Sequence, residues 1–177
     1  YQIWGRVPIN DSFYLNAMIP YQDLTRKFTD RTENIYGFGD ISIIGWYQLK
    51  LYRKGDNDVV DFNNEKVLSP HQFNIGLGIK LPTGAFEERL TDRINPGFQL
   101  GTGSLDGIFS LMHIYSKNRF GVNTAASYYF KSENKNEYQF GNQFSVASNA
   151  FYNIPFKSSA LNPFLGMSAD FYDSIKQ

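Results

Sequence analysis

The chain has 177 residues, no cysteine and a formal net charge of zero. The neutral charge excludes the basic surface that nucleic acid requires, and the lack of cysteine excludes disulfides and cysteine-ligated metals. Aromatic residues make up 17% of a chain whose mean hydropathy is negative. This combination favours a membrane barrel with aromatic girdles and a wet interior over a soluble β-sandwich rich in Tyr and Phe. The length predicts a single domain over residues 1–177.

Apolar residues alternate with a period of two along most of the chain, which is the pattern of β-strands. In chain order we predict strands at residues 1–8, 12–21, 38–53, 71–82, 103–116, 119–131, 138–152 and 161–172. No segment reaches the roughly 18 consecutive apolar residues that a transmembrane helix needs.

Residues 71–82 show the alternation most clearly. Phe73, Leu77 and Ile79 fall on one face, and the residues between the apolar positions are polar or glycine. The segment 119–131 repeats the pattern. Strands of about ten residues with one apolar and one polar face suit a barrel whose apolar face meets lipid and whose polar face lines a lumen. We therefore predict an all-β fold, namely an antiparallel up-and-down transmembrane β-barrel.

The predicted connections alternate in length along the chain. Those at 10–11, 116–118 and 153–160 are tight or moderate, whereas those at 22–36, 83–97 and 132–137 are longer and polar or charged. This alternation is expected when one barrel end faces the periplasm and the other the exterior, although 54–70 is long where a short turn is expected. The charges of 83–97 indicate a solvated loop; the alternative is an inward-folded filter made of Glu87, Glu88, Arg89, Asp92 and Arg93.

The polar face supplies the candidate lumen-lining residues. They are Gln72, Asn74, Lys80, Asn123, Ser127, Lys131, Gln139 and Gln143. Hydrogen-bonding side chains of this kind would let small solutes diffuse past, with selectivity set by the lumen width and its charges.

Four short segments carry a family resemblance: Ile19-Pro20-Tyr21, Gly37-Phe38-Gly39-Asp40, the run from Gly78 to Gly84 and the run from Gly101 to Asp106. In this order and spacing they resemble the outer-membrane barrels of the phenol-degradation "MetA-pathway" type of Gram-negative bacteria. The resemblance covers residues 1–172 and implies an outer-membrane barrel that moves small, often hydrophobic molecules. It supplies no catalytic residue. The positions that match recurrent family positions are Asp40, Pro82, Gly84, Gly101, Gly103 and Asp106.

These positions also have physical explanations. Pro82 suits a strand end because it lacks a backbone N–H for the ladder, and the glycines permit close backbone approach. Asp40 and Asp106 begin predicted strands, where a carboxylate either caps a turn or pairs with Lys50, Lys80 or Lys131 in the lumen. The last predicted strand lacks the terminal aromatic residue of many bacterial barrels, so we expect about ten to twelve strands in the full protein, at least eight of them here.

We predict no enzyme, no cofactor and no metal site. His71 and His113 lie on different predicted strands without a third ligand, and Ser110 and His113 point to opposite faces of one strand. The leading functional prediction is a passive channel or facilitator for small solutes in the bacterial outer membrane. Its partners would be membrane lipid, a small-molecule solute and other envelope proteins.

Two alternative functions remain open. The first is a structural or scaffolding barrel within a larger envelope complex, suggested by the mixed faces of strand 103–116. The second is a soluble lipocalin-like barrel that binds an apolar ligand, which would require apolar residues inside and polar residues outside.

Overall fold

The computed structural model describes residues 1–49, 59–60, 66–67, 70–89 and 94–174. The long strands are β1 (Gln2–Asn10), β2 (Phe13–Lys27), β3 (Thr32–Phe38), β4 (Ile41–Leu49), β7 (His71–Leu81), β8 (Asp106–Lys117), β9 (Phe120–Phe130), β10 (Gln143–Tyr152) and β13 (Phe164–Tyr172). Short strands β5 (Val59–Val60) and β6 (Lys66–Val67) pair with each other, as do β11 (Ile154–Pro155) and β12 (Ala160–Leu161). Among the described residues, no helix has the length and apolar character needed to cross a membrane.

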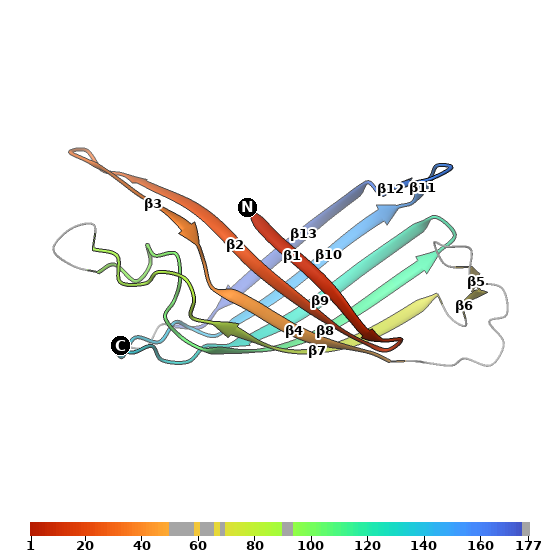
Figure 1. The fold of residues 1–177 in the computed structure, drawn as a ribbon, viewed down its shortest axis with the longest axis horizontal. Coiled ribbons are helices and arrows are strands. Elements are labelled where there is room, and N and C mark those ends of the chain that lie inside the picture. Colours follow the sequence, from red (N-terminus) through yellow and green to blue (C-terminus); the bar gives the residue numbers. More distant parts are fainter. Residues whose placement is uncertain (50–58, 61–65, 68–69, 90–93, 175–177) are drawn as a thin grey trace.

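The long strands follow one another as an up-and-down meander (Figure 1). Their order in the sheet is β1-β2-β4-β7-β8-β9-β10-β13, and β3 pairs with the far half of β2. Neighbouring strands are antiparallel throughout. The sheet curls into a half-barrel with β1 and β13 at its edges. The predicted all-β, antiparallel fold of barrel type is confirmed.

The two faces of the sheet differ in chemistry, as the alternation predicts. The convex face carries large apolar side chains that remain exposed to solvent, and we call them the convex belt. They are Leu15, Ile43, Tyr47, Phe73, Leu77, Ile79, Phe109, Leu111, Phe120, Phe130, Phe144, Tyr152, Leu165, Met167 and Phe171. The concave face holds the buried side chains, among them Trp46 and Ile108 together with the polar Asn74 and Ser110. The core of the half-barrel is therefore mixed and small, and the largest apolar surface faces outward.

Glycines on β7 allow side chains of β4 to lie flat against the concave face. A Cβ on Gly78 would stand 2.5 Å from the carbonyl oxygen of Ile43 and 2.7 Å from the Ile44 side chain. A Cβ on Gly76 would stand 2.9 Å from the ring of Trp46, which stacks on Tyr14 of β2 with ring centroids 6.3 Å apart. On the concave face, larger side chains of β2 and β4 thus cover β7 at Gly76 and Gly78, where β7 has no side chain.

The prediction of a loop over residues 22–36 is wrong. Residues Tyr21–Lys27 of β2 pair with β3, and this hairpin extends past the rest of the sheet (Figure 1). Its strands are joined by polar cross-strand pairs, Arg26 to Glu33 at 2.8 Å and Asn34 to Asp23 at 2.7 Å. They flank one apolar pair, Leu24 opposite the buried Ile35, so the segment carries little apolar alternation.

Other predicted boundaries also shift. The strand predicted over 38–53 begins at Ile41, and its residues 50–53 lie outside the described residues. The strands predicted from 103, 138 and 161 begin at Asp106, Gln143 and Phe164. In the first two cases the preceding residues make hydrogen bonds to loops and side chains instead of to a neighbouring strand.

The connections fall at two ends of the sheet. At the turn end lie residues 11–12, 118–119 and 153–163. At the loop end lie the β2–β3 hairpin and the long connections 82–105 and 131–142. The predicted alternation of short and long connections holds for these segments. The segment 54–70 is described only in part, where β5 and β6 pair.

The close contact beneath Gly78 predicts a position-specific response to an added methyl group. Gly78→Ala should destabilise the protein by about 1–3 kcal/mol because its Cβ would overlap the β4 backbone. Gly107→Ala is the control, since its Cβ would meet its nearest neighbour at 3.7 Å. Equilibrium urea unfolding of both variants measures the difference, and equal midpoints would show that β4 does not lie against Gly78.

Candidate functional site

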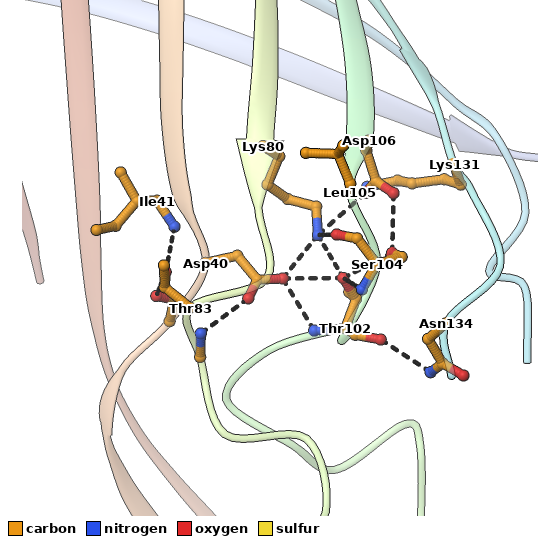
Figure 2. Close-up of polar contacts among 12 residues, drawn as sticks. Asp40, Ile41, Lys80, Thr83, Thr102, Ser104, Leu105, Asp106, Lys131 and Asn134 are labelled. Carbon is orange, nitrogen blue, oxygen red and sulfur yellow. Dashed lines mark hydrogen bonds and ion pairs between the residues drawn. The ribbon is translucent and has the colours of Figure 1, made fainter. Parts of the chain in front are cut away.

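A cluster of buried charged side chains lies on the concave face at the loop end (Figure 2). Asp40 precedes β4, Lys80 lies near the end of β7, Asp106 begins β8 and Lys131 follows β9. With Thr102 and Ser104, these residues are here called the polar cluster. The Lys80 side chain is 10% exposed and that of Asp106 is 0% exposed. Charges removed from water to this extent require partners within the protein.

Lys80 lies between the two aspartates and has a full set of acceptors. Its ammonium contacts Asp40 Oδ2 at 2.6 Å and Asp106 Oδ2 at 3.1 Å. It also donates to the carbonyl oxygen of Ser104 at 3.1 Å and to the Thr102 hydroxyl. A lysine placed in this way pairs with two carboxylates from strands that are not adjacent along the chain, and Lys131 supplies the second positive charge.

Asp40 connects the sheet to the residues that follow β7 and precede β8. Its Oδ1 accepts the Gly84 N–H at 3.0 Å, and its Oδ2 accepts the Thr102 N–H at 2.9 Å and the Thr102 hydroxyl at 2.8 Å. Burial raises the pKa of the Asp40 carboxyl. The hydrogen bonds from Lys80, Thr102 and Gly84 lower it by more, so this pKa lies below its usual value. Asp40 therefore has both of the roles that the sequence left open: its carboxylate caps turns, and it pairs with a lysine.

Asp106 is shared by both lysines of the cluster. Lys131 Nζ lies 3.3 Å from Asp106 Oδ2, opposite Lys80. The other carboxylate oxygen accepts the Ser104 hydroxyl at 2.8 Å and the Ser132 N–H at 3.1 Å. The predicted pairing of Asp106 with lysines is thus present in the structure, with Lys80 and Lys131 as partners. Lys50 lies outside the described residues.

The polar cluster fastens the described residues of the connection between β7 and β8, 82–89 and 94–105, which we call the cross-sheet segment. Gly84 and Gly101 meet backbone to backbone, since a Cβ on Gly101 would stand 2.6 Å from the Gly84 carbonyl oxygen and 2.5 Å from Asp40 Oδ1. Farther along, the carbonyl oxygen of Leu100 accepts the Gln22 side-chain amide at 3.2 Å. The segment therefore runs from β7 across to β2 and partly covers the concave face.

The family-motif positions are explained by this arrangement. Pro82 follows the last residue of β7, and the next residue, Thr83, bridges the Gly39 carbonyl and the Ile41 N–H through its hydroxyl. Gly103 has a φ of +70°, in the region that favours glycine. Together with Asp40, Asp106 and the Gly84–Gly101 contact, these residues build one junction between the sheet and the cross-sheet segment.

A cavity of about 390 Å³ lies beneath the cross-sheet segment. Its lining combines the polar cluster, through Lys80 and Lys131, with apolar and amide side chains such as Met18, Tyr129 and Gln143. A second cavity of about 330 Å³ adjoins it on the side of β13 and shares Thr102, Lys131, Phe140 and Gln143 with the first. The loop end of the concave face is therefore hollow under a fixed cover.

The predicted lumen-lining residues are distributed in two groups. Lys80, Lys131 and Gln143 line the cavity at the loop end, and Gln139 lies nearby in the connection 131–142, where it donates to the Lys131 carbonyl at 2.7 Å. Gln139 was expected within a strand, and this placement is a correction because β10 begins only at Gln143.

The second group lies farther along the concave face. It comprises Gln72, Asn74, Asn123 and Ser127. Ser127 hydrogen-bonds Ser110 at 2.7 Å, and Gln72 donates to Asn74 at 3.2 Å. The amide nitrogen of Asn74 and the amide oxygen of Asn123 are buried and have no hydrogen-bond partner among the described residues. These groups belong to the wall and do not touch the polar cluster.

Several residues of the site are not among the candidates predicted from the sequence. Thr102 and Ser104 flank Gly103 within the run from Gly101 to Asp106, and Asn134 donates to the Thr102 carbonyl at 2.9 Å from the connection 131–142. Phe140 lines both cavities from the same connection. Because connections have no periodicity, only the proximity of Thr102 and Ser104 to Asp106 in sequence could have indicated them.

The charged filter considered for residues 83–97 is only partly described. Glu87 pairs with Lys135 at 2.8 Å, on the exposed side of the loop end. Asp92 and Arg93 lie outside the described residues. The part of the cross-sheet segment that lines the cavity lies within 96–102 and contributes backbone and uncharged side chains.

The two histidines meet on the convex face near the turn end. His71 Nδ1 and His113 Nε2 are 2.9 Å apart, and the rings stack with Phe73 beside them. In the described ranges, no group of three or more His, Asp or Glu side chains could hold a metal ion. This pair belongs to the aromatic part of the convex face and lies apart from the polar cluster.

Comparison with known proteins identifies the relatives of this chain. The model of the family described as "Putative MetA-pathway of phenol degradation" matches residues 2–175. No curated protein matches the chain. The family expected from the four short segments is thereby confirmed over nearly the whole chain.

The burial of the polar cluster predicts a large cost for removing Lys80. Lys80→Met leaves Asp40 and Asp106 without their shared cation and should destabilise the protein by about 3–5 kcal/mol, as measured by urea unfolding at neutral pH. Lys135→Met is the control, because Lys135 is 62% exposed and pairs with an exposed glutamate; it should change the unfolding midpoint little. Similar midpoints for the two variants would refute a structural role for the polar cluster.

Proposed function

This chain belongs to the family described as the putative MetA-pathway of phenol degradation, and we propose that its sheet is part of the wall of an outer-membrane β-barrel that lets small solutes diffuse through. The observation that carries the proposal is the convex belt. Large apolar side chains from β2, β4, β7, β8, β9, β10 and β13 form it, and some are mostly exposed, such as Leu77 at 66% and Leu165 at 84% exposure. Contiguous apolar surfaces of this extent mark contact with a membrane or another protein.

Strand length supports the membrane as the partner. A tilted strand needs about 9–11 residues to cross the hydrocarbon core. Strands β4, β7, β9, β10 and β13 have 9, 11, 11, 10 and 9 residues. A water-soluble ligand-binding barrel would instead place polar residues outside, and the apolar residues of these strands point outward.

The concave face supports a route for solutes. Its side chains include amides and hydroxyls such as Gln72, Asn123 and Ser127, and at the loop end it opens into the cavity beside Lys131. Hydrogen-bonding groups along a wall replace part of a solute's hydration shell and lower the barrier to its passage. The cross-sheet segment narrows this route at the loop end.

A bilayer places one further requirement on the sheet. Each unpaired backbone N–H or C=O group in hydrocarbon costs several kcal/mol, so that open sheet edges do not occur there. Among the described strands, β1 and β13 each have one neighbour. In the membrane both edges must therefore be hydrogen-bonded, either to each other or to further strands.

Paired arginine substitutions on one strand test which face meets lipid. Ala125 and Ala126 are adjacent in the middle of β9, and their side chains lie on the concave and convex faces, respectively. Ala126→Arg should cost about 2–4 kcal/mol in lipid vesicles if this position is near the bilayer midplane. Ala125→Arg, toward the polar wall, should cost less. Urea titration of the full-length protein in vesicles measures both values.

Leu77→Arg on β7 is an independent check, since Leu77 lies on the convex face two strands away. A loss similar to that of Ala126→Arg is expected. If Ala126→Arg and Leu77→Arg fold and insert as well as the wild type, the membrane proposal is wrong.

Single-channel recording tests the conduit directly. The full-length protein, refolded in detergent and inserted into a planar bilayer, should give reproducible conductance steps because a polar wall admits water and ions. Insertion is checked independently by protection from external protease. Inserted protein with no conductance would contradict an open conduit and favour a barrel with a structural role.

A further inference from the structure

Lys131 is the member of the polar cluster whose hydrogen-bonding capacity is not used up. An ammonium group has three N–H donors. In the part of the chain that the structure describes, the one acceptor near Lys131 Nζ is Asp106 Oδ2, at 3.3 Å. Its side chain is only 11% exposed, so bulk water has little access to the remaining donors. Lys80, by comparison, donates to three acceptors and makes one further ion-pair contact with Asp106.

The spare donors of Lys131 face a cavity with aromatic walls. Lys131 lines both cavities of the loop end, as does Phe140. Tyr129 lines one cavity and Tyr172 the other, and both are register partners of Gln143, which lies between them in the sheet. The Lys131 ammonium also lies 5.3 Å from the Tyr129 ring centroid. The lining of these cavities thus combines one cation with three aromatic rings and an amide.

The carboxylates near this cation are already neutralised or screened. Asp40 accepts hydrogen bonds from Lys80, Thr102 and Gly84, and Asp106 accepts from Ser104 and Ser132 as well as contacting both lysines. Asp173 lines the cavity on the β13 side and is exposed, where solvent screens its charge. Asp106 Oδ2 accepts no hydrogen bond within the described residues, but it contacts the ammonium groups of both Lys80 and Lys131, so a further acceptor that approaches Lys131 meets a carboxylate whose charge is already paired.

We propose that the cavity at Lys131 binds a small organic carboxylate with a flat, apolar body. The carboxylate accepts charge-assisted hydrogen bonds from Lys131, and the body lies against Phe140, Tyr129 and Tyr172. In the proposed conduit, such a site would select small organic carboxylates with a flat, apolar body as solutes, and this part of the inference rests on the proposed function. The binding itself depends only on the cavity.

Benzoate and benzamide form a matched pair of probes, because they share a planar body and differ in charge. Calorimetric titration of the full-length protein in detergent at neutral pH should give saturable binding of benzoate. Benzamide should bind at least about tenfold more weakly, since it lacks the charge that strengthens a hydrogen bond to an ammonium. Equal binding of the two probes, or no saturable binding of benzoate, would overturn the proposal.

Four variants locate the binding. Lys131→Met should weaken benzoate binding by about tenfold or more, and Lys131→Arg, which keeps the charge, should retain most of it. Lys135→Met removes an exposed lysine of the same end and should leave binding unchanged. Asp173→Asn should leave binding equal or make it tighter. Unchanged binding in a folded Lys131→Met protein would overturn the proposal.

The calorimetric and electrical results separate the two proposals. Benzoate binding without bilayer conductance would retain the site and reject the conduit. Conductance without benzoate binding would retain the conduit and reject the site. Folding of each variant is verified by its unfolding midpoint, so that a loss of binding is not confused with a loss of structure.

Discussion

The structure depends on one interaction, the placement of Lys80 between Asp40 and Asp106. Burying an ammonium or a carboxylate alone costs several kcal/mol, so none of these side chains can remain buried without the others. The strand ends that carry them, and the cross-sheet segment bound through Thr102, are therefore held in one arrangement. The net charge of the polar cluster is close to zero, which lowers the free-energy cost of burying its charged side chains in a site with little water.

The cover over the cavity follows from this interaction. The Gly84–Gly101 contact brings two parts of the cross-sheet segment so close together that no side chain fits between them. The segment can then reach Gln22 on β2 and close over the concave face. A single charge-paired junction thereby holds the cross-sheet segment against the loop end, while β4 packs closely over Gly76 and Gly78 of β7.

The half-barrel inverts the usual arrangement of a small protein. Its buried side includes Asn74 and Ser110, and its exposed side includes Leu77 and Leu165. In water such a distribution would be unfavourable because apolar surface remains hydrated. The distribution becomes favourable only where the outer face meets an apolar phase or another apolar surface.

The sequence predicts those parts of the fold in which geometry has a fixed period. Alternation in 71–82 and 119–131 identifies β7 and β9 almost to the residue, because extended backbone turns successive side chains to opposite faces. The hairpin of β2 and β3 has no such signal, since Arg26 and Glu33 replace apolar partners. The polar cluster is only partly predictable. The sequence identifies Asp40 and Lys80 as candidate residues, but their pairing across 40 residues depends on the order of strands in the sheet.

The order of the strands restricts the number of further strands that can join the two edges of the sheet, β1 and β13. Successive strands reverse direction, and β1 and β13 are the first and eighth strands along the path, so they run in opposite directions. A continuous antiparallel ring can therefore form if β1 and β13 meet directly or through an even number of intervening strands. An odd number would force one parallel contact, which a ring of up-and-down hairpins does not contain.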